Sequence, residues 1–245
     1  MLKLKNLIKE ALPTKEIDPI QFPNPVTGAL KKIFLNKGEQ DGDPNDDIVN
    51  TQKASIPAAK LKASQDAIYL GKSLGMAVGG VKGGDLDAVI SSDNHILDGH
   101  HRWAATMFAS PTTAVGGVKA DLKIGDLVPV LRSLGDVFGN ARRGEPKGGD
   151  VNIFKATRLD IENIIADLDQ QNTEFINPGM ASKFVNSVGG INVLEKRLKL
   201  IQRAKPPSGA PDRTDMPVIE PKKGEMPKMK NLLQKGKIDV REPYA

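Results

Sequence analysis

Glycine and proline divide this chain into short segments, because both residues interrupt regular helices and strands. They gather in four clusters, at residues 19–28, 79–84, 139–149 and 205–227. A chain of 245 residues suits one domain, or a smaller domain with appended segments. We therefore expect four parts: a loop-rich arm with an amphipathic helix over 1–54, a folded domain over 55–150, a helical segment over 151–204 and a Pro- and Lys-rich extended tail over 205–245.

Composition excludes several classes of site. Cysteine is absent, which rules out disulfide bonds, a thiolate nucleophile and zinc bound by cysteine. No run of 18 or more apolar residues occurs, so we expect no membrane-spanning helix and no membrane partner. The first residues lack the uninterrupted apolar core of a signal peptide, so we expect no export by that route. The net charge of +5 permits an anionic partner without requiring one.

The hydrophobic pattern predicts both strands and helices. Short apolar runs predict strands, at residues 55–61, 88–90, 95–97 and 118–124. Helical spacing predicts helices, at residues 1–12, 64–78, 100–109, 125–139, 157–171, 177–188 and 191–204. Ser64 and Thr157 are the expected N-caps of two of these helices. Pro129 should lie in the first turn of its helix or bend that helix.

The stretch from Asp93 to Met107 holds all three histidines and the only tryptophan of the chain. Within it, a predicted strand passes through Asp98 and Gly99 directly into a predicted helix. Glycine allows a sharp turn and a close approach of the backbone to a ligand. The first helical turn offers N–H groups that have no partner in the helix, at the positive end of the helix dipole. Such a turn binds anions, and phosphate in particular.

Side chains of the same turn favour an anion over a metal ion. The planar guanidinium of Arg102 suits phosphate oxygens, and His100 and His101 add donors whose charge changes near neutral pH. Metal binding is the competing hypothesis, because five potential ligands are close in the sequence: Asp93, His95, Asp98, His100 and His101. Neighbours on a helix point about 100° apart, so His100 and His101 would not readily bind one ion. Magnesium held by one carboxylate and by nucleotide phosphates is the favoured metal chemistry.

The pattern Gly-x-x-Arg-x-x-Ala, formed by Gly99, Arg102 and Ala105, resembles the ParB/sulfiredoxin-like superfamily, in particular its phage-type "ParB-like nuclease" domains. Gln65 matches a Gln-containing segment that precedes this pattern in the superfamily, and the similarity covers residues 55–138. The resemblance implies an α+β fold with a small mixed sheet and helices, and it implies that the domain binds a nucleotide. The nuclease label is an analogy of fold and does not establish nuclease chemistry.

Two departures from the superfamily pattern limit what the resemblance implies. Sulfiredoxins have cysteine where this chain has His100, so sulfiredoxin activity is excluded. Chromosome-partitioning members have Gly-Glu-Arg-Arg and bind CTP, whereas His100 and His101 replace the Glu and the first Arg here. The CTP clamp of those members therefore does not carry over with the resemblance.

The first functional hypothesis is a nucleotide-binding protein that performs phosphate chemistry: NTP hydrolysis, phosphoryl transfer or a nuclease-like reaction. The expected cofactor is Mg²⁺ with ATP or CTP, and the residues leave open whether the protein is an enzyme. The expected roles are as follows: Asp98 as magnesium ligand or base, His100 as general acid or base, Gly99, His101 and Arg102 as phosphate-binding residues, and Gln65 as the residue that orients the nucleotide or substrate.

Residues 1–12 resemble the capsid-targeting peptides of large tailed phages. The alternative hypothesis is therefore a head-associated structural protein of the virion that keeps the fold without turnover and contacts capsid proteins through residues 1–12 and 205–245. These hypotheses place the protein in the virion or the host cytoplasm. A third hypothesis is DNA binding through residues 151–204. The basic stretch from Leu194 to Lys205 supports it, although the solvated face of an amphipathic helix is the favoured interpretation of that charge.

Overall fold

The computed structural model describes residues 48–137, 150–219 and 233–239. The predicted helix at 1–12, most of the N-terminal arm and the predicted linker at 140–149 lie outside these described residues.

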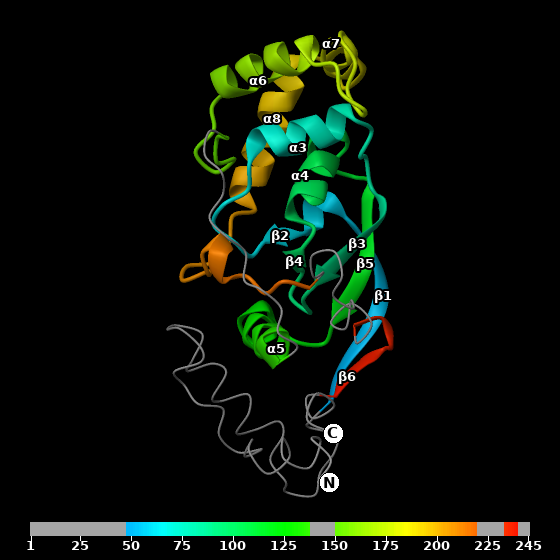
Figure 1. The fold of residues 1–245 in the computed structure, drawn as a ribbon, viewed down its shortest axis with the longest axis vertical. Coiled ribbons are helices and arrows are strands. Elements are labelled where there is room, and N and C mark those ends of the chain that lie inside the picture. Colours follow the sequence, from blue (N-terminus) through cyan, green and yellow to red (C-terminus); the bar gives the residue numbers. More distant parts are fainter. Residues whose placement is uncertain (1–47, 138–149, 220–232, 240–245) are drawn as a thin grey trace, which may run out of the picture.

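Strands within the described residues form one mixed sheet (Figure 1), in the order β2-β4-β3-β5-β1-β6. Their bounds are β1 (Ile48–Pro57), β2 (Lys62–Ala63), β3 (Gly84–Ile90), β4 (His95–Asp98), β5 (Ala114–Ala120) and β6 (Lys237–Asp239). The pairs β2/β4 and β3/β5 are parallel, and the other neighbouring pairs are antiparallel. The expected α+β class with a mixed sheet is confirmed.

Helices cover both faces of the sheet. Their bounds are α3 (Leu70–Val78), α4 (His100–Ala109), α5 (Ile124–Val137), α6 (Arg158–Gln170), α7 (Met180–Ser187) and α8 (Ile191–Arg203). Figure 1 shows α3, α4, α6, α7 and α8 grouped at one end of the molecule and α5 at the other. None of the helices described in the structure is long and apolar enough to cross a membrane.

The sheet separates two hydrophobic clusters because successive side chains of a strand point to opposite faces. Along β4, Ile96 packs into the first cluster and Leu97 into the second. The first cluster contains the inner faces of α3, α4, α6 and α8, including the fully buried Trp103. The second contains the inner face of α5. Both faces of the central strands are therefore buried. Because of this, a ligand can reach these strands at their ends but not at their faces.

β1 begins at Ile48, inside the region predicted to be a loop. Residues 51–57 pair antiparallel with β5, and residues 48–50 pair with β6. The prediction was wrong because four of the ten side chains of this strand are polar and exposed, and its partner strand is distant in the sequence.

β5 spans Ala114–Ala120, several residues earlier than the predicted strand at 118–124. Its two consecutive glycines do not suggest a strand, but the packing requires them. A Cβ at Gly117 would overlap the Ala88 carbonyl oxygen of β3, and a Cβ at Gly116 would lie 2.9 Å from the Asp85 Cα. The close approach coincides with a register shift in β3, where Asp87 has φ 50°.

The helix expected from Ser64 begins only at Leu70, so Ser64 is not its N-cap. Instead, the Ser64 hydroxyl donates to the carbonyl oxygen of Ile96 in β4. Pro129 lies inside α5, beyond the first turn. The difference at Ser64 arises because tertiary contacts outweigh local propensity. For Pro129, a bend of the helix stays the prediction.

The helical segment agrees with the sequence. The expected N-cap Thr157 forms a capping box with Asp160 at the start of α6. Helix α8 buries Leu194, Leu198 and Ile201 in the first cluster, on the apolar face predicted by their spacing. The amphipathic interpretation of this basic stretch is therefore confirmed.

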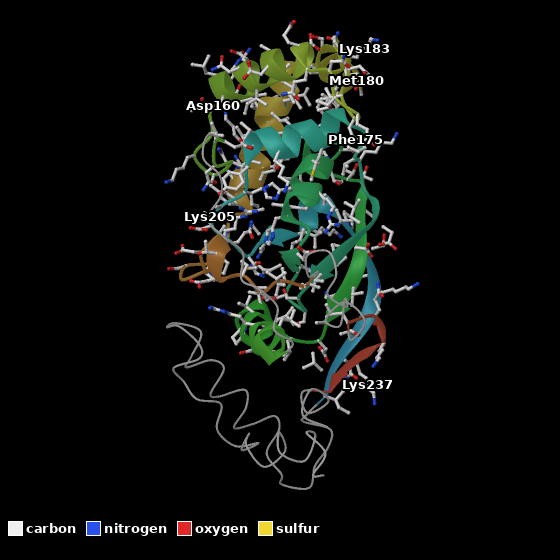
Figure 2. All side chains as sticks on the ribbon, viewed as in Figure 1. Asp160, Phe175, Met180, Lys183, Lys205 and Lys237 are labelled. Carbon is white, nitrogen blue, oxygen red and sulfur yellow. The ribbon has the colours of Figure 1, made fainter. Side chains whose placement is uncertain are left out.

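The described parts of the expected C-terminal tail belong to the fold. Met216, Ile219 and Leu233 are buried in the second cluster. Lys237, labelled in Figure 2, lies on β6, which pairs with the first residues of β1. The expectation of a tail that only extends over the surface is wrong for these residues.

Candidate functional site

The predicted strand–glycine–helix turn is present at the end of β4. The strand ends at Asp98, Gly99 has φ 96° in the left-handed region, and α4 begins at His100. Gly99 is the N-cap residue, and it has no side chain with which to cap the helix. Only glycine adopts the left-handed conformation routinely, so the turn depends on Gly99.

An ion pair holds the Arg102 guanidinium beside the turn. Its Nη2 donates to Asp98 Oδ2 at 3.1 Å, and the two side chains are 31% and 16% exposed. The same Nη2 lies 3.6 Å from the position that a Cβ on Gly99 would occupy. Because Asp98 uses one of the five N–H groups of the guanidinium, Arg102 keeps the donor capacity to bind an anion at this place.

The two histidines of the turn hold the preceding loop. His100 is 4% exposed, and its Nε2 accepts from the Ser64 N–H at 3.2 Å. His101 is 8% exposed, and its Nε2 accepts from the Tyr69 N–H at 3.1 Å. The rings of His101 and Tyr69 are stacked, with centroids 5.8 Å apart. A nitrogen that accepts a hydrogen bond carries no proton, so the network assigns the neutral form with the proton on Nδ1 to both rings.

Gln65 lies in this loop, between the two residues that the histidines hold. It is 3% exposed, and its Nε2 donates to the carbonyl oxygen of Ala67 at 2.6 Å. Residues 151–153 hold the loop from another side: the Ile153 N–H donates to Ile68, and the Leu70 N–H donates to Val151. The structure therefore places five of the expected site residues in one turn and Gln65 on a loop bonded to that turn.

Residues not predicted from the sequence also contact this loop. The Arg213 guanidinium lies over the Tyr69 ring, 5.2 Å from its centroid. Burial, together with the neighbouring Asp212 carboxylate, raises the pKa of the Asp66 carboxyl above its ordinary value. No local pattern connects residues so far apart in the sequence, so periodicity and motif spacing could not have identified them.

The other candidate metal ligands, Asp93 and His95, serve the turn between β3 and β4 and link it to the start of α5. The Asp93 carboxylate accepts from the Ser91 hydroxyl at 2.6 Å and from the Ile124 N–H at 2.9 Å, and it lies 3.3 Å from His95 Nδ1. Burial raises the pKa of Asp93, but these hydrogen bonds and the His95 charge outweigh burial and lower that pKa overall. Within residues 48–137, 150–219 and 233–239, no three His, Asp or Glu side chains converge as a metal site.

A shallow hollow adjoins Asp98 on the side of the second cluster. Its empty space is about 290 Å³, including the open mouth, and its lining is largely apolar: Asp87, Val89, Asp98, Val118, Ile219 and Leu233. The part of this space that is comparable with a ligand cavity is only about 20 Å³. Pockets that enclose a small ligand usually occupy roughly 300–1,000 Å³, so this hollow does not enclose one.

No protein-family model, curated protein or solved structure matches this chain. What the turn can do chemically is therefore judged from its own residues.

Proposed function

We propose that this protein binds the phosphates of a nucleotide at the turn formed by residues 98–102, with Mg²⁺ and ATP or CTP as the expected ligands. One observation carries the proposal: Gly99, in the left-handed region, begins a helix without a side-chain cap of its own, and Arg102 Nη2 lies beside Gly99. The backbone N–H groups and the helix dipole supply one half of an anion site, and Arg102 supplies the other. The resemblance to the ParB/sulfiredoxin-like superfamily supports a nucleotide as the source of the phosphates.

The contacts refine the roles of the two histidines. A phosphate needs donors, but the Nε2 atoms of His100 and His101 accept hydrogen bonds from the loop. Both residues therefore position the loop that carries Gln65. A role for His100 as general acid through Nε2 would first require release of the Ser64 N–H.

Asp98 is the residue of this site suited to magnesium. Bound magnesium would neutralise phosphate charge, and it needs few protein ligands when phosphates supply the others. The Asp98 carboxylate is bonded to Arg102 through Oδ2, so the same carboxylate would hold the metal and orient the arginine. Hydrolysis, phosphoryl transfer and nuclease-like chemistry all begin with this binding step, and binding is therefore the first property to test.

The test is calorimetric titration of ATP, CTP, GTP and ADP, with and without Mg²⁺, into the wild type and into Arg102→Gln. Loss of a charge-assisted phosphate contact costs about 2 kcal/mol, so we expect affinity to fall by roughly 30-fold. Arg158→Gln is the matched control, because Arg158 also lies in a first helical turn and pairs with a carboxylate four residues away. We expect this control to bind like the wild type. Equal losses in both variants, or no binding by any nucleotide, would contradict the proposal.

The virion and DNA-binding hypotheses stay predictions. Residues 1–12, on which the first depends, lie outside the described residues. For the second, α8 offers fewer solvent-facing basic groups than its sequence suggests, because Arg197 donates to the carbonyl oxygens of Phe108 and Ala109 at the end of α4.

A further inference from the structure

His101 joins the candidate turn to the start of α3 through Tyr69. Its Nε2 accepts from the Tyr69 N–H at 3.1 Å, and the two rings stack with centroids 5.8 Å apart and planes 20° apart. Tyr69 is the N-cap residue of α3, and Figure 1 shows α3 next to α4, against which it packs. The loop of residues 64–69 is therefore fixed to the turn at its last residue by a hydrogen bond and a ring contact.

This hydrogen bond depends on the protonation state of His101. An imidazole nitrogen accepts a hydrogen bond only while it carries no proton, and histidine takes up a proton close to neutral pH. A proton on Nε2 would place two N–H donors opposite each other. His101 is only 8% exposed, so the ring and the Tyr69 N–H must separate before water can replace the lost partner.

Charged or titratable side chains lie on the elements next to this contact. They are Asp66 in the loop, Asp98, His100 and Arg102 in the turn, Lys72 and Asp150 at the start of α3, and Arg213 over the Tyr69 ring. The carboxylates favour a positive charge on His101, whereas the lysine and the arginines oppose it. Because these influences have opposite signs, the hydrogen bond from Tyr69 is the contact that distinguishes the neutral ring from the protonated one.

Other contacts of the same loop do not titrate. The Leu70 N–H donates to the Val151 carbonyl oxygen at 2.8 Å, and the Ile153 N–H donates back to the loop at 2.7 Å. Backbone groups keep such hydrogen bonds at any ordinary pH. A proton on His101 should therefore act at Tyr69 and leave the contacts with residues 151–153 intact.

We propose that His101 is a pH-sensitive latch between the turn and the loop of residues 64–69. While His101 is neutral, it holds Tyr69 on the turn. When Nε2 takes up a proton, the hydrogen bond is lost and Tyr69 separates from the ring. Any consequence for Gln65, which the same loop carries, rests on the proposed function, whereas the latch itself does not.

The test is residue-resolved hydrogen–deuterium exchange of the full chain at pH 7.5 and pH 5.5, corrected for intrinsic rates. Histidine in water takes up a proton at about pH 6.5, so release is favoured at the lower pH and the protection of the Tyr69 amide should fall roughly tenfold. The Leu70 and Ile153 amides are internal controls and should keep their protection. Equal protection of Tyr69 at the two pH values, or an equal loss at both control amides, would overturn the latch.

Two variants assign the pH dependence to His101. His101→Gln keeps an acceptor oxygen but cannot take up a proton there, so Tyr69 protection should be equal at the two pH values. His95→Gln is the matched control, because His95 is also buried but lies beside Asp93, and its variant should keep the pH dependence of Tyr69. A dependence that persists in His101→Gln, or that is lost in His95→Gln, would overturn the latch.

If His101→Gln does not fold, the comparison of Tyr69 with Leu70 and Ile153 in the wild type still decides. No nucleotide takes part in these measurements, so failure of the latch leaves the proposed function standing. Failure of the nucleotide titrations likewise leaves the latch standing.

Discussion

Two helices of this protein begin in opposite ways. At the start of α6, the Thr157 hydroxyl accepts from the Asp160 N–H, and the Asp160 carboxylate accepts from the Thr157 N–H at 2.7 Å. At the start of α4, Gly99 provides no side-chain cap. His100 and His101 instead accept hydrogen bonds from the loop of residues 64–69. A helix that satisfies its own first turn needs no ligand there. The first turn of α4 has no such cap from its own N-cap residue, which is why we propose that an anion binds there.

The arginines of these two turns, Arg158 and Arg102, differ in how far their ion pairs are exposed to solvent. Arg158 pairs with Glu162 at the surface, where the side chains are 44% and 42% exposed. Arg102 and Asp98 are less exposed, so water screens their charges less. The hydrogen bond from Arg158 to Glu162 raises the pKa of Arg158. Because this arginine is charged at any ordinary pH, the higher pKa does not change its charge. The partly buried pair, Arg102 and Asp98, is therefore the one that we propose contributes to ligand binding.

In this comparison of the starts of α4 and α6, we expect the largest loss of stability when His100 is replaced. Replacing it by Leu removes the acceptor of the Ser64 N–H and leaves a buried donor without a partner, which costs about 2–3 kcal/mol. Urea denaturation would measure this loss. His100→Gln keeps an acceptor and should lose less. If the two variants are equally stable, the hydrogen bond does not contribute and the loop is held by other contacts.

The next prediction is that the start of α6 contributes to stability, whereas the start of α4 contributes to nucleotide affinity. Thr157→Ala removes the capping box and should destabilise the protein by about 1 kcal/mol without changing nucleotide affinity. Arg102→Gln should do the reverse, with affinity lost and the midpoint of unfolding nearly unchanged, because part of its ion pair is exposed to solvent. Measuring both properties in both variants tests the contrast, which fails if either variant loses both.

The smallest effect is the pH dependence of the α6 cap. Hydrogen bonds from the Thr157 hydroxyl and N–H lower the pKa of Asp160 below its ordinary value of 3.8. A carboxyl with a depressed pKa stabilises the fold fully above its ordinary pKa, and the stabilisation is lost as the pH falls through the lower folded value. We expect the difference in Tm between the wild type and Asp160→Asn to be present at pH 6 and to vanish in strong acid. A difference that persists at pH 2 would show that the charge of Asp160 is not responsible.

The features that could be predicted from the sequence depend on residues close together in the chain. The Gly99 turn, the Thr157 cap and the apolar face of α8 each lie within one strand end or a few helical turns, where periodicity and capping chemistry act. The members of the candidate turn were predictable for the same reason.

The features that could not be predicted depend on distant partners. β1 is a strand because β5 pairs with it, although its own residues resemble a loop. Ser64 has the chemistry of an N-cap, but Ile96 and His100 take its hydroxyl and its N–H. From the sequence, His100 is predicted to be a general acid or base and His101 a phosphate-binding residue. Only the fold shows that their Nε2 atoms accept hydrogen bonds from the preceding loop.

Among the described strands, β6 pairs with only part of the outer edge of β1. It pairs with residues 48–50, and among the described residues no strand continues this pairing along residues 52–57. A bare edge can recruit a strand from another chain, and proteins discourage this with charged side chains and proline. Lys53 is exposed on this edge and Pro57 ends it. A shortened chain that lacked β6 would lose the strand that pairs with residues 48–50, so we expect it to aggregate more readily than the full chain.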